Sequence, residues 1–166
     1  MRLTALAFGF AAISGSAQAD PFEDFGTSMK YGLPLAAAVC AVDQDRFEDF
    51  AIRGAAQAVI VLGLKALFDG SDIGMRPSGE GRGFPSGHSA AAGFGAGDLA
   101  SKCFDDEPAL GAVAYGAAGL TAASRVHSGE HTPAQVLAGS LIGISFGAAS
   151  FGFGGEGASF DIGLRF

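Results

Sequence analysis

The feature that most constrains this chain is a series of long apolar stretches that carry few charges and show no strict alternation of apolar and polar residues. Stretches of this length and pattern predict helices rather than strands. We expect five helices, over residues 28–42, 47–69, 86–102, 108–125 and 133–152. Short runs rich in Asp, Gly or Pro separate them, and Pro108 and Pro133 suit the first turn of a helix. The predicted fold is therefore all-α, an antiparallel helical bundle of about five helices.

Residues 1–19 have the pattern of a cleaved signal peptide. A positive start at Arg2 precedes an apolar run over residues 3–13, and Ala17-Gln18-Ala19 forms a small-x-small cleavage site. The alternative, a first transmembrane helix, is disfavoured because this run is too short for a hydrocarbon core of roughly 30 Å. We therefore expect a signal peptide over 1–19 and one helical domain over 20–166, located in the periplasm or cell envelope.

Composition narrows the class of protein. Charged residues make up 16% of the chain, too few for a disordered protein or a coiled coil. The net charge of −7 argues against a nucleic-acid partner, which a basic surface would grip. Two cysteines exclude a disulfide-scaffolded miniprotein and the usual cysteine-built zinc site. Cys40 and Cys103 fall at the same end of the expected bundle and could form a disulfide in an oxidising compartment.

The relation to a membrane is open at the level of sequence. Residues 108–124 and 132–155 are uncharged and approach the roughly 20 residues that a span needs, whereas charges interrupt the second and third helices. The loops 43–49 and 102–107 are acidic on balance, against the positive charge expected on a cytoplasmic side. This favours a soluble or peripherally attached bundle with possible membrane contact. Residues 160–166 alternate like a short strand, although a frayed terminus is favoured.

The histidines point to the chemistry. All three lie in two short segments, 85–88 and 124–131, instead of being scattered. In an antiparallel bundle, the end of the second helix, the start of the third, the end of the fourth and the start of the fifth meet at one pole. Six polar residues then converge there: Lys65, Arg76, Ser86, His88, Arg125 and His131. A cationic pocket in an acidic chain predicts an anionic ligand, and phosphate suits Arg, Lys and a helix N-terminus.

These segments resemble the signature of the type 2 phosphatidic acid phosphatase (PAP2) and vanadium haloperoxidase superfamily, K-x6-RP, PSGH and SR-x5-H-x3-D. Residues 85–88 read PSGH, and Ser124-Arg125 is followed after five residues by His131. The resemblance covers roughly residues 59–147 and implies a helical bundle with phosphatase activity on a phosphorylated small molecule or lipid. It further implies a helix of the family's type that begins after His131.

The resemblance also implies roles for individual residues. His131 would attack phosphorus to form a phosphohistidine, and His88 would protonate the leaving oxygen and then activate water. The phosphoryl oxygens would be held by Lys65, Arg76, Ser86, Gly87 and Arg125. These cations would take the place of a metal, so the resemblance implies no metal and no cofactor.

Two positions depart from the family pattern. Ten residues separate Lys65 from Arg76 instead of six, so Lys65 either reaches the site over a bulged loop or is only a helix-end lysine. The family's last Asp, which orients the nucleophilic His, is Gln135 here. The amide oxygen of Gln135 can accept the same N–H hydrogen bond but carries no charge. Glu130 could supply the negative charge that the family's Asp provides. Residues 132–135 also fit a capping box, with Thr132 as N-cap.

The sequence leaves alternative roles open for several side chains near the motifs. His127 lies either at the pocket rim or exposed in a loop, and Arg82 is either a headgroup contact or, as favoured, a solvated charge. We interpret four aromatic side chains as packing residues rather than a lipid cradle: Phe22, Phe25, Phe47 and Phe50.

For function, the leading hypothesis is an envelope phosphatase acting on a phosphomonoester or pyrophosphate. The alternatives are a catalytically impaired phosphate- or lipid-binding protein, a vanadium-dependent haloperoxidase and a structural envelope protein.

Overall fold

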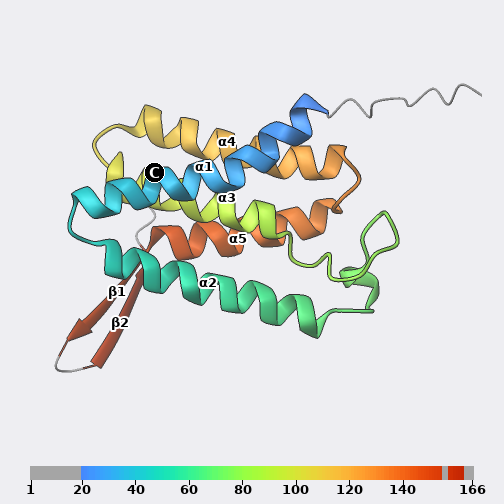
Figure 1. The fold of residues 1–166 in the computed structure, drawn as a ribbon. Coiled ribbons are helices and arrows are strands. Elements are labelled where there is room, and N and C mark those ends of the chain that lie inside the picture. The colour runs from blue at the N-terminus through green and yellow to red at the C-terminus, as the bar shows by residue number, and fades with distance from the viewer. Residues whose placement is uncertain (1–19, 155–156, 163–166) are drawn as a thin grey trace, which may run out of the picture.

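The structure, a computed structural model, describes residues 20–154 and 157–162. Its five helices form the predicted antiparallel bundle, which is confirmed (Figure 1). They are α1 (Pro21–Asp43), α2 (Phe47–Leu67), α3 (Gly87–Asp98), α4 (Pro108–His127) and α5 (Pro133–Ala148). The expected signal peptide lies outside the described residues.

Helix boundaries differ from the prediction most at the start of α1 and the end of α5. Helix α1 begins at Pro21 because the Asp20 side chain accepts a hydrogen bond from the Phe22 amide and caps the helix. Helix α5 ends at Ala148, so the helix predicted to residue 152 was too long. The chain continues as β1 (Ala149–Gly154), which pairs antiparallel with β2 (Gly157–Ile162). Four glycines over residues 152–157 disfavour a continued helix. For residues 160–162 the favoured frayed terminus was therefore wrong, and the strand alternative holds.

Helix α3 is the centre of the bundle. It packs against α1, α4 and α5, whereas α2 packs mainly against α5. Nine of its twelve residues are buried, and a π-helical turn (Leu99–Cys103) continues it. The hydrophobic core around it is built from small side chains and a few large ones: Leu33, Ala37, Ala41, Phe50, Ala92, Phe94, Ala96, Leu99, Ala114 and Ala118. The many alanines bring the helices close together.

Glycines set the spacing between α3 and α5. A Cβ atom added at Gly139, Gly143 or Gly147 would run into the backbone carbonyls of Ser86, Ala90 and Phe94, respectively. Both sets are spaced by four residues, so one face of α5 lies directly on one face of α3. This contact joins the start of α3 to the start of α5, where the Ser86 amide donates to the Gln135 carbonyl at 2.9 Å.

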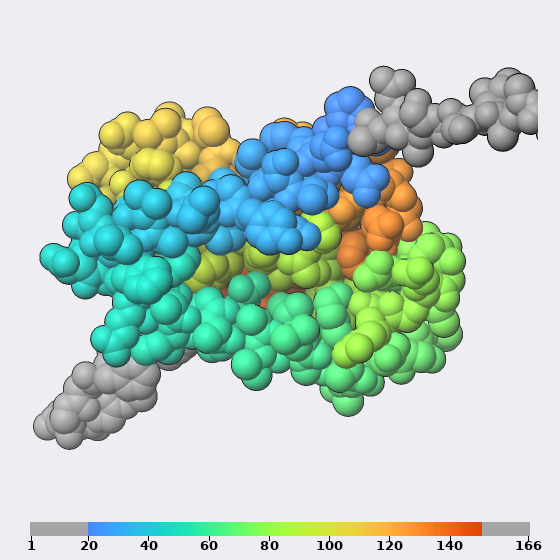
Figure 2. Space-filling model, in the orientation of Figure 1, coloured from blue at the N-terminus to red at the C-terminus, as the bar shows by residue number. Residues whose placement is uncertain are grey.

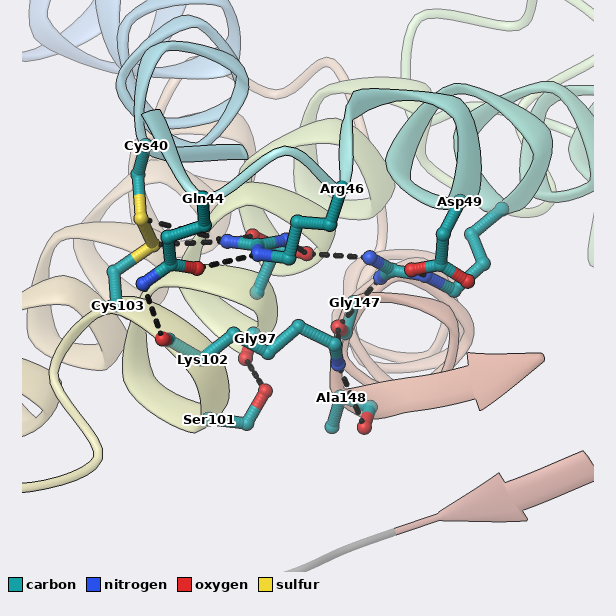
Figure 3. Close-up of polar contacts among 12 residues, drawn as sticks. Cys40, Gln44, Arg46, Asp49, Gly97, Ser101, Lys102, Cys103, Gly147 and Ala148 are labelled. Atoms are coloured by element: carbon teal, nitrogen blue, oxygen red, sulfur yellow. Dashed lines mark hydrogen bonds and ion pairs between the residues drawn. A yellow bond between two sulfur atoms is a disulfide. The ribbon is translucent and has the colours of Figure 1, made fainter. Parts of the chain in front are cut away.

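At one pole of the bundle a disulfide and a buried ion network tie α1, α2, α3 and α5 together (Figure 3). Cys40 and Cys103 are bonded, with Cα atoms 6.3 Å apart. The fully buried Asp98 carboxylate pairs with Arg46 at 2.8 Å and with Arg53 at 2.7 Å. Arg53 also donates to the carbonyls of Phe146 and Gly147, which end α5. The disulfide that the sequence left open is therefore present.

Much of the outer surface is apolar. Within the described part of the chain, α2 alone is long and apolar enough to cross a membrane, with a mean hydropathy of 1.5. Length and composition are also sufficient in many core helices of soluble proteins, so they do not place α2 in a membrane. Helices α4 and α5, whose uncharged runs came closest to a span at the level of sequence, are not both long and apolar enough.

Candidate active site

The second pole of the bundle gathers the residues that the sequence singled out. The loop between α2 and α3 and the loop between α4 and α5 lie side by side there, next to the start of α1 (Figure 1). Hydrogen bonds join the two loops through Gln135, whose amide nitrogen donates to the carbonyls of Ile73 at 2.9 Å and Met75 at 2.8 Å. The helix ends that the antiparallel bundle was expected to bring together therefore meet.

His131 is buried and is held by Gln135. It precedes α5, and its Nδ1 lies 3.0 Å from the Gln135 side-chain oxygen. Gln135 is fully buried, and the same oxygen accepts the amide of Thr132 at 3.1 Å. The predicted capping box is confirmed, because the Thr132 hydroxyl in turn accepts the Gln135 amide. Gln135 thus fills both of the roles considered for it, helix cap and partner of His131.

The Gln135 amide also decides which His131 nitrogen carries the proton. Its NH₂ group faces two carbonyl oxygens, which only accept, so its oxygen must be the atom that faces His131. That oxygen has no proton, so His131 Nδ1 is the donor. The neutral ring then presents an unprotonated Nε2. Burial lowers the pKa of His131, Arg76 and Lys65 lower it further, and the Gln135 hydrogen bond and Glu130 oppose the shift.

Arg76 and Lys65 occupy the loop side of the site. Arg76 donates to the Glu130 carboxylate at 2.9 Å. Lys65 lies in the last turn of α2 and donates to the Arg82 carbonyl at 2.8 Å, and its Cε lies beside Gly87. Burial, followed by repulsion from Arg76 and Arg82, lowers the pKa of Lys65 to about 8. Lys65 is therefore part of the cluster rather than an isolated helix-end lysine.

The longer spacing between Lys65 and Arg76 is absorbed by a compact turn. A single 3₁₀ turn, η1 (Asp72–Gly74), takes up part of the extra length, and the Ser71 hydroxyl caps it. A Cβ at Gly74 would collide with the Phe68 carbonyl, so the chain folds back on itself at this point. The bulge returns Arg76 to the site.

Arg125 and His88 form the opposite side. Arg125 is 3% exposed, and its guanidinium lies 3.3 Å from His88 Nε2. It also donates to the Glu23 carboxylate at 2.8 Å and to the Ser128 hydroxyl at 2.9 Å. Burial lowers the pKa of His88 to about 3, with repulsion from Lys30, Arg125, His131 and Arg76 adding to the shift. His88 is consequently neutral near pH 7 in the free protein.

Ser86 caps the start of α3, and Gly87 is the first residue of the helix. Ser86 is fully buried, and its hydroxyl caps the helix by accepting the Ser89 amide. The first amides of a helix lack partners inside it and carry the positive end of its dipole. The start of α3 therefore adds favourable potential for an anion to that of the cationic side chains.

Arg76 and Arg125 each have one buried N–H group that makes no hydrogen bond to the described residues. Within the described part of the chain, the buried Nε–H groups of Arg76 and Arg125 have no hydrogen-bond acceptor. Buried donors are normally paired, and exceptions concentrate at functional positions. Two such donors beside the buried His131 and the half-buried His88 fit a site that receives an anion.

Two candidates lie at the edge. His127 is exposed and pairs with Asp20 at 2.9 Å. The Arg82 side chain is 61% exposed and lies 4.0 Å from Asp69, in line with a solvated charge.

Sequence reasoning missed Glu23 and Lys30, because α1 lies outside the motifs and its residues carry no signal of the site. In the part of the chain described, His, Cys, Asp and Glu side chains form no group of three or more that could hold a metal ion.

The comparisons agree with this geometry. The PAP2 superfamily matches the chain over residues 42–156, well over half of its length. The chain belongs to the PAP2 superfamily. The match includes every residue of the pole named from the sequence, from Lys65 to Gln135, and excludes the start of α1 with Glu23 and Lys30.

One relative gives a more specific likeness. The PAP2 chain is 40% identical over 95 residues to a protein from Helicobacter pylori strain J99 named lipid A 4'-phosphatase. The alignment covers 52% of this chain and 46% of that protein, so the chain spans about half the length of the curated relative it matches. No solved structure matches the chain significantly.

Proposed function

We propose that this PAP2 protein is a cell-envelope phosphatase that hydrolyses a lipid phosphate, a phosphomonoester or pyrophosphate, through a phosphohistidine on His131. The observation that carries the proposal is the convergence of Lys65, Arg76 and Arg125 on two histidines, the buried His131, held by Gln135, and the half-buried His88. Cations placed around a nucleophile, with N–H donors that have no acceptor yet, suit a reaction that transfers a phosphoryl group.

In the first step, Nε2 of His131 attacks phosphorus and the bond between phosphorus and the ester oxygen breaks. The hydrogen bond from Nδ1 to Gln135 keeps the lone pair on Nε2 and aims the ring. The Gln135 oxygen stabilises the positive imidazole that forms, less strongly than a carboxylate would. Glu130, on the neighbouring position and paired with Arg76, adds negative charge nearby.

His88 supplies the proton that the leaving oxygen needs. In the free protein its pKa is about 3, because it is buried among cations, so it is unprotonated at pH 7. A phosphate dianion entering the site offsets the repulsion from Arg125 and Lys30 and raises this pKa. Substrate binding and protonation of His88 are therefore coupled, and the acid forms where the substrate lies.

In the second step, neutral His88 takes a proton from water, and the water oxygen attacks phosphorus and breaks its bond to His131. Inorganic phosphate leaves and His131 returns to its neutral form. Lys65, Arg76 and Arg125 stabilise the phosphoryl oxygens in both steps, together with the first amide of α3 at Gly87, since the Ser86 amide already donates to the Gln135 carbonyl.

A lipid substrate and an envelope location have their own support. The relative from Helicobacter pylori is named for action on lipid A, a phosphorylated lipid. The surface of α2 exposes large apolar side chains, among them Val59, Leu62 and Leu67. An apolar surface of this kind favours a protein that works at or in a membrane. The signal-peptide pattern at residues 1–19 leads to the same compartment.

The test is phosphate release by the purified protein, in mild detergent, from lipid phosphates, isoprenyl pyrophosphates and soluble phosphomonoesters. We expect His131→Ala to lower turnover by at least about a thousandfold, as loss of a nucleophile does. His127→Ala, which removes an exposed histidine, should leave turnover close to that of the wild type. Unchanged release in His131→Ala would contradict the proposal. Phosphate binding by the wild type without turnover would favour the impaired binding protein instead.

A further inference from the structure

The first two turns of α1 lie against the end of α4. Figure 2 shows the blue atoms of the start of α1 next to the orange atoms of this end of α4. A Cβ added at Gly26 would collide with the Ser124 hydroxyl, so the two helices approach closely there. Asp20, which caps α1, pairs with His127 at 2.9 Å. These contacts hold α1 against residues on both sides of Arg125.

Glu23 lies between these two contacts and pairs with Arg125. Its carboxylate accepts a hydrogen bond from Arg125 Nη2 at 2.8 Å. The Arg125 side chain is 4% exposed, whereas that of Glu23 is 41% exposed. A buried guanidinium that loses its anionic partner is strongly destabilised, so Glu23 helps to keep Arg125 in the site. The match to the PAP2 superfamily begins at residue 42, so this partner comes from outside the matched region.

The contacts of Arg125 divide its donors into two groups. Nη2 has two N–H groups, and it donates to Glu23 and to the Ser128 hydroxyl at 2.9 Å. Nη1 lies 3.3 Å from His88 Nε2, and the buried Nε–H has no acceptor among the described residues. Because the guanidinium is planar and rigid, two partners on Nη2 fix the directions of Nη1 and Nε. These two nitrogens remain for an anion.

Without Glu23, the Arg125 guanidinium is held less firmly. The Ser128 hydroxyl would be left on Nη2, and a neutral hydroxyl is a weaker partner than a carboxylate. Arg125 would still bring positive charge to the site, but its donors would no longer have fixed directions. Transition-state stabilisation depends on donors fixed where charge develops, and a misplacement of about 1 Å can cost about a hundredfold in rate.

We propose that Glu23 is a positioning residue of the candidate active site, which acts through Arg125. It holds the guanidinium so that Nη1 and Nε face His88 and the transferring phosphoryl group, and it does not touch the substrate. The proposal rests on the proposed function and adds a residue of α1 to the site. Because a carboxylate beside Arg125 also repels phosphate, we expect Glu23 to raise the rate without tightening phosphate binding.

The first measurement is phosphate release from butyl phosphate by the full-length protein, with kcat and KM determined separately. Glu23→Met replaces the carboxylate by an apolar chain of similar length, and kcat should fall by roughly ten- to a hundredfold while KM does not rise. Glu23→Gln keeps an acceptor without the charge and should recover part of the loss. Asp24→Met removes the neighbouring exposed carboxylate of the same helical turn and should leave both constants unaltered.

A double-mutant cycle separates positioning from a general structural effect. If Glu23 acts through Arg125, Glu23→Met should lower kcat little further in the Arg125→Met background. An equal fall in both backgrounds, or a kcat of Glu23→Met equal to that of Asp24→Met, would overturn the proposal. If Glu23→Met fails to fold, Glu23→Gln takes its place, and a kcat equal to that of Asp24→Asn would overturn the proposal.

Binding of two anions distinguishes this proposal from the proposed function. Orthovanadate adopts a five-coordinate geometry that resembles a transferring phosphoryl group, whereas inorganic phosphate stays tetrahedral. Glu23→Met should lower the ratio of vanadate affinity to phosphate affinity by roughly tenfold. This loss in a protein that hydrolyses no phosphate ester would support the role of Glu23 and contradict the phosphatase. An unchanged ratio would overturn the role of Glu23, even with full phosphatase activity. Absence of affinity for both anions in the wild type would overturn both.

Discussion

Gln135 makes four hydrogen bonds through one side-chain amide, to His131, Thr132, Ile73 and Met75. Two of them need an oxygen and two need an NH₂ group, so an amide satisfies all four and a carboxylate does not. The residue that departs from the family pattern is therefore matched to its surroundings. The loop that carries Arg76 is tied to His131 through it.

Gln135→Glu keeps the size of the side chain but removes both donors. We expect a drop in kcat/KM of at least about tenfold and a lower melting temperature, because two carbonyls lose their partners and face a negative charge. Gln135→Asp, being shorter, should behave no better. The same change at Gln44, exposed at the opposite pole, is the control and should leave kcat/KM unaltered. Higher activity in Gln135→Asp than in the wild type would show that the carboxylate of the family pattern is needed here too.

Lys65 should set the alkaline side of the pH profile. Its pKa of about 8 means that the lysine loses its charge as pH rises through this value, so kcat/KM, which reports the free enzyme, should fall above pH 8. Lys65→Arg keeps its charge at every accessible pH and should remove this fall, whatever its activity at neutral pH. The measurement is phosphate release against pH for both proteins. A fall that is identical in the two would assign it to another group.

At the scale of elements, the contact between α3 and α5 sets the distance between the two histidine segments. At the closest points of this contact no side chain separates the helices, because Gly139, Gly143 and Gly147 pack directly against backbone carbonyls at the start of α3 and along it. Van der Waals packing of this density transmits a displacement of one helix directly to the other. The start of α3 and the start of α5, and with them His88 and His131, are thereby held in a fixed relation.

Gly143→Ala tests this contact. The new methyl group would collide with the Ala90 carbonyl, so we expect a loss of roughly 1–3 kcal/mol in the free energy of unfolding. Gly116→Ala is the matched control, since Gly116 is exposed on α4 and an added methyl meets open space there. Gly116→Ala should raise the free energy of unfolding by up to about 1 kcal/mol, because Ala has a higher helix propensity than Gly. Urea unfolding measures both, and equal stability of the two variants would contradict the close contact.

The elements differ in how well the sequence predicts them. Apolar stretches bounded by Asp, Gly and Pro were enough to predict five helices, and their antiparallel order was enough to bring Lys65, Arg76 and Arg125 to one pole. The β-hairpin was predicted only in part, because β1 was read as the end of a helix and the strand at residues 160–162 was an alternative to a frayed terminus. Glu23 was missed because its importance depends on Arg125, 102 residues away in sequence, and no local pattern encodes such a pairing.

At the scale of the whole molecule, the two poles carry different kinds of charge. At the disulfide pole the ions are paired around the fully buried Asp98, which lies between Arg46 and Arg53, and Lys102 donates to the carbonyls of Gly147 and Ala148 at the end of α5 (Figure 3). At the histidine pole, burial and then repulsion among the cations lower the pKa values of Lys65 and His88, and Arg76 and Arg125 each keep a buried Nε–H without an acceptor among the described residues. A buried, paired network costs much to break, whereas cations that retain unused donors beside their carboxylate partners Glu23 and Glu130 can still receive an anion. The first pole stabilises the fold that holds the second.

The disulfide should contribute to stability without contributing to the reaction. It closes a loop of 63 residues, and the loss of chain entropy in the unfolded state corresponds to roughly 4 kcal/mol. We expect the double variant Cys40→Ser, Cys103→Ser to unfold at lower urea than the oxidised wild type, and reduced wild type to match the variant. Because the bond lies at the pole opposite His131, kcat/KM measured well below the unfolding transition should stay within about twofold of the wild type. Equal stability of the oxidised and reduced protein would mean that the ion network around Asp98 holds this pole together by itself.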